Sequence, residues 1–136
     1  VTALASPDNL DFVRGLGASE AVDRTTDYES RIGGFDMVLD AFGPAAQERS
    51  WSLLKRGGIL ISLVAPPPED VAATHGVRAT MVYGVPSGAT LRAVDALIEE
   101  GRVVVTIART YPVEQAVAAL EEVQRGQVRG KVVLTF

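Results

Sequence analysis

The sequence contains no cysteine and only one histidine, His75, among its 136 residues. Without cysteine the chain forms neither a disulfide nor a thiolate metal site, and a single histidine argues against a zinc site of the usual ligands. No run of about 18 apolar residues is present, so we expect no membrane-spanning helix. Residues 1–8 lack the basic and apolar regions of a secretory signal peptide. These absences predict a soluble, cytoplasmic protein without a bound metal.

Positive charge is also in short supply. The 13 basic side chains are outnumbered by 17 acidic ones, which leaves a net charge of −4. No basic run is present, so nucleic acid and anionic membranes are not expected as partners. Apolar residues make up 47% and charged residues 22% of the chain, a mixture typical of globular proteins. The length corresponds to one domain or to part of a larger one.

Apolar runs and helical spacing alternate along the chain. We predict strands at residues 1–5, 21–23, 35–40, 59–64, 77–83, 103–107 and 131–136, and helices at 7–16, 27–32, 45–54, 91–98 and 113–123. Strands that alternate with helices of crossover length indicate a parallel sheet in an α/β fold. The strand at 59–64 is almost entirely apolar, which predicts that both of its faces are covered.

Four segments together resemble the medium-chain dehydrogenase/reductase superfamily. Residues 35–43 (FDMVLDAFG) are similar to its motif D-V-V-L-D-x-V-G, and residues 54–62 (LKRGGILIS) to L-K-P-G-G-x-L-V-S, with Arg56 in place of proline. Residues 5–18 and 129–134 resemble the segment after the second Rossmann strand and the closing motif x-G-K-I-V-L. The resemblance covers essentially the whole chain, in order, and favours the zinc-independent, quinone-oxidoreductase-like branch.

This resemblance implies an incomplete Rossmann-like, doubly wound parallel sheet that lacks its first strand and glycine-rich turn. Residues 1–102 would be a truncated nucleotide-binding domain, and residues 103–136 a tail that returns to an N-terminal catalytic domain, which is missing. No G-x-G-x-x-G motif is present. In the strand order 3-2-1-4-5-6, the missing strand leaves a gap beside residues 35–40. We expect the chain to close this gap by direct pairing or with a strand from a second copy, so a homo-oligomer is predicted.

The resemblance also implies that NADP(H) is the cofactor, with NAD(H) not excluded and no metal. Ser6 would leave room for a 2′-phosphate, and Arg24 would stack on the adenine or pair with that phosphate. The remaining predicted cofactor-binding residues are Asp40, Ala41, Phe42, Gly43, Val64, Ala65, Tyr83, Arg129 and Lys131. The alternatives are a helix cap for Ser6, a loop cap for Asp40, core for Val64 and Ala65, a dimer interface for Tyr83, and solvated surface for the cationic residues.

No catalytic residue is assigned, because in such enzymes the nicotinamide carries the hydride chemistry. The implied parent reaction is reduction of a quinone or an α,β-unsaturated carbonyl, a small-molecule substrate bound only by the complete enzyme. Without the glycine-rich phosphate cradle, we expect the chain alone to bind NADPH weakly and to be inactive. An oligomeric interaction module and one half of a split reductase are the alternatives.

Overall fold

The computed structural model describes residues 1–126 and 128–136. They form two compact units, which we call the N-terminal unit (Val1–Gly84) and the C-terminal unit (Val85–Phe136). The sequence-based boundary after residue 102 assigns residues to the domains of a complete enzyme, and it stays a prediction. Each unit is described by itself.

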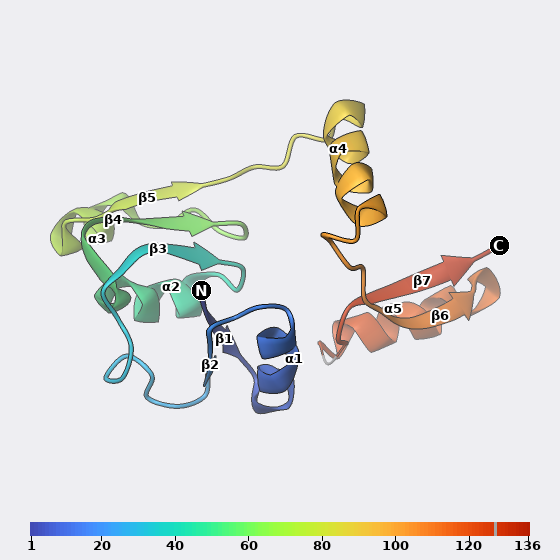
Figure 1. Ribbon diagram of the computed structural model, residues 1–136, viewed down its shortest axis with the longest axis horizontal. Coiled ribbons are helices and arrows are strands. Elements are labelled where there is room, and N and C mark those ends of the chain that lie inside the picture. Colours follow the sequence, from blue (N-terminus) through green and yellow to red (C-terminus); the bar gives the residue numbers. More distant parts are fainter. Residues whose placement is uncertain (127) are drawn as a thin grey trace. The chain divides into compact units, whose positions relative to one another are not determined.

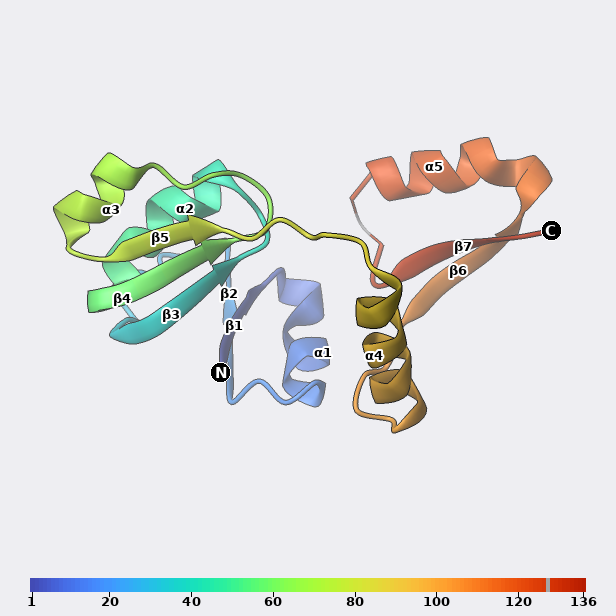
Figure 2. The same cartoon turned by 90° about the horizontal axis from the view of Figure 1, so that it is seen from above.

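The N-terminal unit contains two parallel sheets (Figures 1 and 2). Strands β1 (Thr2–Ala5) and β2 (Glu20–Asp23) form the first, joined by the 3₁₀ helix η1 (Pro7–Asn9) and helix α1 (Leu10–Gly15). Strands β3 (Phe35–Asp40), β4 (Leu54–Ser62) and β5 (Arg78–Met81) form the second in that order. Its connections are α2 (Pro44–Ser50) with the 3₁₀ helix η2 (Trp51–Leu53), and α3 (Glu69–His75). The predicted parallel α/β fold is confirmed.

The three-stranded sheet packs its helices on one face only. Leu60 of β4 is fully buried against Trp51 and Ala72, and α2 and α3 lie together above this face (Figure 2). On the other face of β3, Met37 and Leu39 are 56% and 58% exposed. The expectation of cover on both faces concerned residues 59–64, and there Leu60 and Ser62 are buried on the helix-covered face, whereas Ile59 and Ile61 on the other face are only partly buried. The described residues therefore cover one face of this strand fully and the other in part.

The two sheets of the N-terminal unit are joined by side chains rather than by backbone pairing. Val22, Tyr28 and Leu53 form a second buried cluster, against which Leu4 and Phe35 pack. In the part of the chain that the structure describes, neither β1 nor β2 pairs with β3. The prediction of direct pairing across the gap is therefore wrong, and a strand from a second copy stays a prediction.

Three predicted elements differ from the observed ones. Residues 27–32 form a turn rather than a helix. In this turn the Tyr28 carbonyl accepts hydrogen bonds from the N–H groups of Arg31 and Ile32, and the Tyr28 side chain is buried. The helix predicted at 45–54 ends at η2, because Leu54 pairs with Phe35 and begins β4. The strand predicted at 103–107 begins only at Ile107, where pairing with Lys131 starts. In this last case β-propensity was present without a partner strand.

The C-terminal unit pairs one sheet with one helix. Strands β6 (Ile107–Pro112) and β7 (Lys131–Thr135) are parallel, and η3 (Val113–Gln115) and α5 (Ala116–Gln124) connect them. Helix α4 (Gly88–Glu99) precedes them, and the Ser87 hydroxyl caps it by accepting from the Thr90 N–H at 3.0 Å. Within the described residues, none of the helices is both long and apolar enough to span a bilayer.

Candidate functional site

The carboxyl ends of β3 and β4 lie side by side, since Asp40 and Ser62 are register partners. Asp40 is buried, and its Oδ1 accepts hydrogen bonds from the backbone N–H of Phe42 at 2.9 Å and of Gly43 at 3.0 Å. Gly43 has a φ of 103°, which side-chain-bearing residues rarely adopt. The carboxylate thus caps the loop after β3, as the loop-cap alternative for Asp40 predicts.

Two further residues, neither of them expected from the sequence, complete this cluster. The Gln47 Nε2 of α2 lies within hydrogen-bond distance of three acceptors, Asp40 Oδ2 at 3.0 Å, Ser62 Oγ at 3.1 Å and the Ala65 carbonyl at 2.9 Å, which share its two hydrogens. Both Gln47 and Ser62 are buried. The available signal for Ser62 is that it is the one polar residue in the apolar run 59–64. For Gln47 it is a polar side chain four residues before the buried Trp51.

The Asp40 carboxyl has a shifted pKa. Burial acts to raise the pKa of Asp40, but the N–H groups of Gly43 and Phe42 and the side chains of Gln47 and Ser62 outweigh it, so the pKa lies below its ordinary value. Hydrogen bonds to the charged form favour ionisation. The cluster is therefore built around an ionised carboxylate.

This shift makes the stability of the N-terminal unit dependent on pH. Because the folded-state pKa is below the unfolded-state value, the stabilisation is complete above about pH 5 and is lost as pH falls through the folded-state pKa. We expect the urea midpoint of Trp51 fluorescence to fall over this range in the wild type. In Asp40→Asn this part of the pH dependence should be absent, and an unchanged pH dependence in that variant would contradict the assignment.

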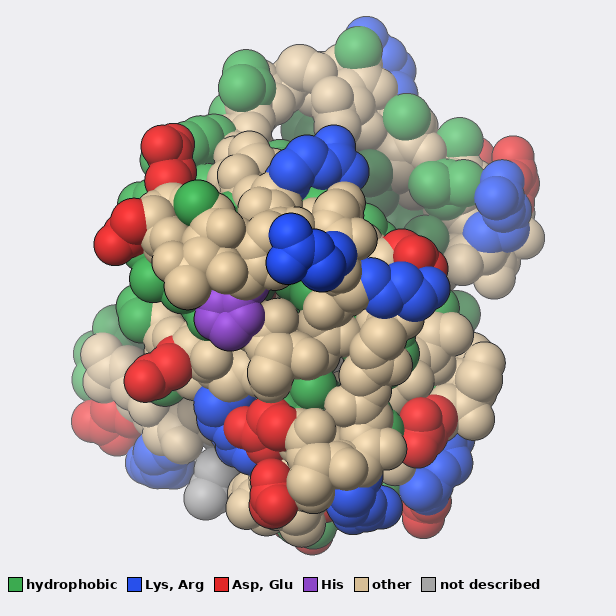
Figure 3. Space-filling view, turned by 90° about the vertical axis from the view of Figure 1, so that its left-hand side faces the viewer, with side chains coloured by type: hydrophobic (Ala, Val, Ile, Leu, Met, Phe, Trp, Pro, Cys, Tyr) green, Lys and Arg blue, Asp and Glu red, His purple; other side chains and the backbone are tan. Residues whose placement is uncertain are grey.

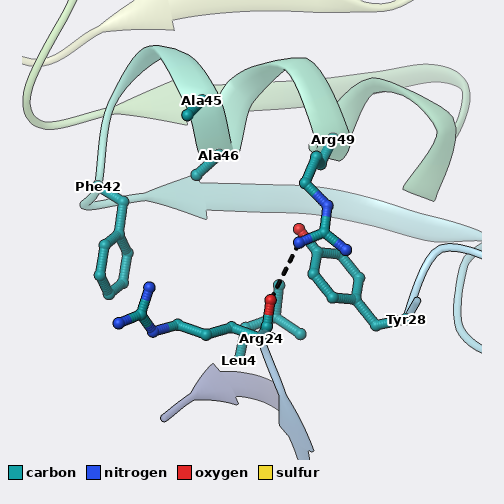
Figure 4. Close-up of a pocket in the computed structure, with 7 residues that line it drawn as sticks. All are labelled: Leu4, Arg24, Tyr28, Phe42, Ala45, Ala46 and Arg49. Carbon is teal, nitrogen blue, oxygen red and sulfur yellow. Dashed lines mark hydrogen bonds between the residues drawn. The ribbon is translucent and has the colours of Figure 1, made fainter. Parts of the chain in front are cut away.

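A pocket of about 270 Å³ lies between the first sheet and helix α2 (Figure 4). Its walls come from Leu4 of β1, Ala45 and Ala46 of α2, and the side chains of Arg24, Tyr28, Phe42 and Arg49. The Arg24 guanidinium lies over the Phe42 ring, 5.2 Å from its centroid. The structure therefore brings together two residues that the sequence analysis predicted as neighbours of a cofactor.

Arg49 is a structural cation of this pocket. Its guanidinium lies 3.9 Å from the Tyr28 ring centroid and donates to the carbonyls of Arg24 at 3.0 Å and Thr26 at 2.7 Å. It also pairs with both carboxylate oxygens of Glu29, and this hydrogen bonding holds the pKa of Glu29 below its usual value. Arg24 differs, because no carboxylate lies within ion-pair distance of it in the described chain. Of the two arginines that line this pocket, Arg24 is therefore the one whose guanidinium is available to bind an anion.

The other predicted residues fall into separate groups. The Ser6 side chain does not cap η1; its hydroxyl accepts from Asn9 Nδ2 at 3.0 Å. Val64 is 51% exposed beside Gly43, and Tyr83 is 70% exposed after β5, so neither is core. Ala41 is exposed in the loop after β3, and Ala65 is partly buried. Arg129 and Lys131 are exposed in the C-terminal unit, so their grouping with the N-terminal residues stays a prediction.

His75 is the last residue of α3, and Gly76 follows it with a φ of 65°. It lies at the surface with acidic and basic side chains around it, and its ring stacks on Trp51 with centroids 6.2 Å apart (Figure 3). Over the described residues there is no group of three or more histidine, cysteine, aspartate or glutamate side chains that could hold a metal ion.

Comparison with known proteins gives consistent matches. A sequence profile of the family described as zinc-binding dehydrogenase matches residues 16–134. The chain is 35% identical to a probable zinc-binding oxidoreductase, mitochondrial, of Arthroderma benhamiae, over 93% of the chain and 41% of the relative. It is 30% identical to the NADPH-dependent alkenal/one oxidoreductase, chloroplastic, of Arabidopsis thaliana, over 98% of the chain and 33% of the relative.

Among solved structures, the quinone oxidoreductase from Coxiella burnetii matches with a TM-score of 0.90 and 27% identity. This match covers 100% of the chain and 44% of that protein. The chain thus spans about two fifths or less of the length of the curated relatives it matches. Its parallel strands correspond to part of their Rossmann-like domain. Given the profile match over most of its length, the chain belongs to the zinc-binding dehydrogenase family of the medium-chain dehydrogenase/reductase superfamily.

Proposed function

We propose that this chain is the cofactor-binding segment of an NADP(H)-dependent reductase of the zinc-independent, quinone-oxidoreductase-like branch. The observation that carries the proposal is the convergence of Gly43, Ala65 and the Arg24–Phe42 pocket at the carboxyl ends of parallel strands. Ligands of open α/β sheets bind at this edge. Quinones and α,β-unsaturated carbonyls are the proposed substrate classes, by analogy with the relatives named above. The proposed compartment is the cytoplasm.

The residues at this edge suit a dinucleotide. Gly43 has no side chain, so its backbone offers close approach to a ribose or nicotinamide. Arg24 provides a cation for a 2′-phosphate, and the exposed Phe42 ring provides a face for a base. When bound, the reduced nicotinamide would supply the hydride, while these groups hold and orient it. The chain has no G-x-G-x-x-G turn, so the pyrophosphate would lack its helix N-terminus here.

Titration of the ¹⁵N-labelled chain with NADPH and NADH tests the proposal. We expect weak, saturable shifts of the amide signals of Arg24, Phe42 and Gly43, with a dissociation constant of about 0.1 mM or above, and NADPH about tenfold tighter than NADH. Arg24→Gln should remove this preference. Arg14→Gln is the matched control, because Arg14 is paired with Asp11 at 2.7 Å.

Three results would count against this assignment. Shifts that are absent at several millimolar NADPH, or that cluster away from this edge, would exclude the proposed site. Sub-micromolar affinity for NADPH would instead contradict the view that the chain lacks its phosphate cradle. Equal affinities of wild type and Arg24→Gln for NADPH would remove Arg24 from the site.

A further inference from the structure

We infer that Gln47 is a positioning residue, which holds the loops after β3 and β4 at a fixed spacing so that their backbones form one surface. The inference rests on the proposed function for its consequence, since these two loops line the proposed cofactor site. The geometry itself is independent of any ligand. Gln47 would touch no cofactor atom and would act through Asp40 and Ala65.

The neighbours of Gln47 fix the orientation of its amide. The ionised Asp40 carboxylate and the Ala65 carbonyl can only accept hydrogen bonds, and both lie within 3.0 Å of the same amide nitrogen. The nitrogen therefore points toward them and the amide oxygen points away. A single NH₂ group thus joins a side chain at the end of β3 to the backbone three residues beyond β4.

Ser62 completes the connection between the two loops. Its hydroxyl donates to Asp40 Oδ2 at 3.0 Å and accepts from the backbone N–H of Val64 and Ala65, both at 3.2 Å. Asp40 holds the first loop through two N–H groups, and Ser62 holds the second in the same way. Gln47 bonds to both of these side chains, so it is the residue common to the two loops.

Gln47 contacts the two loops from their buried side, where α2 packs into the core. Gln47 is 3% exposed and lies on α2, whose neighbouring residues Ser50 and Trp51 are also buried. In front, Phe42 and Val64 are 63% and 51% exposed, so few contacts of their own hold the loops in place. A Cβ on Gly43 would lie 3.6 Å from Val64 Cγ1, so the two loops run close enough here for a side chain at position 43 to contact Val64. Their relative position thus depends on the buried amide.

The variant Gln47→Glu tests this role without a change in side-chain shape. At pH 7 the introduced carboxylate oxygen would face the Asp40 carboxylate and the Ala65 carbonyl, neither of which can donate to it. We therefore expect hydrogen exchange at the amides of Gly43, Val64 and Ala65 to accelerate about tenfold or more. The Leu60 amide of the core should keep most of its protection. Glu48→Gln, the reverse exchange at the adjacent exposed position, is the matched control and should change none of these amides.

The double variant Asp40→Asn/Gln47→Glu exchanges donor and acceptor between the two side chains. The asparagine introduced at position 40 can donate to the new carboxylate at position 47 while its oxygen still accepts from Gly43, so protection at Gly43 should return toward the wild-type rate. That carboxylate cannot donate to the Ala65 carbonyl, so the Ala65 amide should stay unprotected. Recovery of protection at Gly43 without recovery at Ala65 would distinguish a positioning role of Gln47 from a general effect on stability. Equal loss of protection at Leu60 and at the loop amides, or no loss at either, would overturn the inference.

The NADPH titration links the loop geometry to binding. With Trp51 fluorescence showing the N-terminal unit folded, Gln47→Glu should reduce the NADPH-induced shift at Gly43 to about a third or less of that in the wild type. Equal shifts in both proteins would overturn the inference even where the loops have loosened. If the wild type itself does not respond to NADPH, the proposed function fails, while the exchange rates still decide whether Gln47 holds the loops.

Discussion

Replacing Asp40 by alanine should destabilise the N-terminal unit by about 3–4 kcal/mol. The Asp40 carboxylate accepts from two backbone N–H groups and from the side chains of Gln47 and Ser62, all in a buried setting. Alanine would leave the N–H groups of Phe42 and Gly43 without this acceptor and would remove one acceptor from Gln47 and one from Ser62; each unsatisfied buried donor costs about 1–3 kcal/mol before the loops rearrange. The same change should abolish the NADPH response at Gly43.

Urea unfolding followed by the fluorescence of Trp51 measures this effect. Trp51 is the only tryptophan and is buried in the N-terminal unit, so its signal reports that unit alone. Asp36→Ala is the matched control on the same strand, because the Asp36 side chain is 87% exposed and pairs with Lys55 at the surface. We expect the control to cost about 0.5 kcal/mol or less. Equal losses in the two variants would show that the buried network contributes nothing to stability.

The fold was readable from the sequence where local patterns and tertiary packing agree. The apolar run at 59–64 predicted a strand, and the structure has this strand with shifted bounds, Leu54–Ser62. Residues 103–107 differ, because β-branched residues favour a strand only when a partner strand is available. The turn at Tyr28 was missed for a similar reason, since a distant arginine on α2 holds the carbonyls before it.

The candidate site was predictable only in part. Asp40 and Gly43 were predicted because ligands of open α/β sheets bind at the carboxyl ends of neighbouring parallel strands, which meet at one edge. This reasoning did not select Gln47, because Gln47 lies on a helix and its partner Ser62 is 15 residues later in the sequence. A polar residue on the buried face of a helix is a usable signal, but the partner that satisfies it is known only once the strands are in register. Arg24 and Phe42 met through tertiary packing that no local pattern encodes.

The largest effect in the C-terminal unit is expected at Gly130, just before β7. Gly130 has a φ of 104°, and a Cβ there would lie 2.2 Å from the carbonyl oxygen of Thr106. That same oxygen accepts the Lys131 N–H at 2.8 Å where β6 and β7 begin to pair. Alanine would therefore combine backbone strain with a clash against a fixed carbonyl, at a cost of about 3–5 kcal/mol.

Hydrogen exchange at the amides of β6 and β7 is the measurement, with Trp51 fluorescence as the internal reference for the N-terminal unit. Gly130→Ala should accelerate exchange along both strands and leave the Trp51 urea midpoint unchanged. Gly101→Ala separates strain from clash, because Gly101 has a φ of 70° and no atom within 4 Å of the added carbon. Its expected cost is about 1 kcal/mol. If both variants cost the same, the close approach of Gly130 to Thr106 does not determine how β6 and β7 pair.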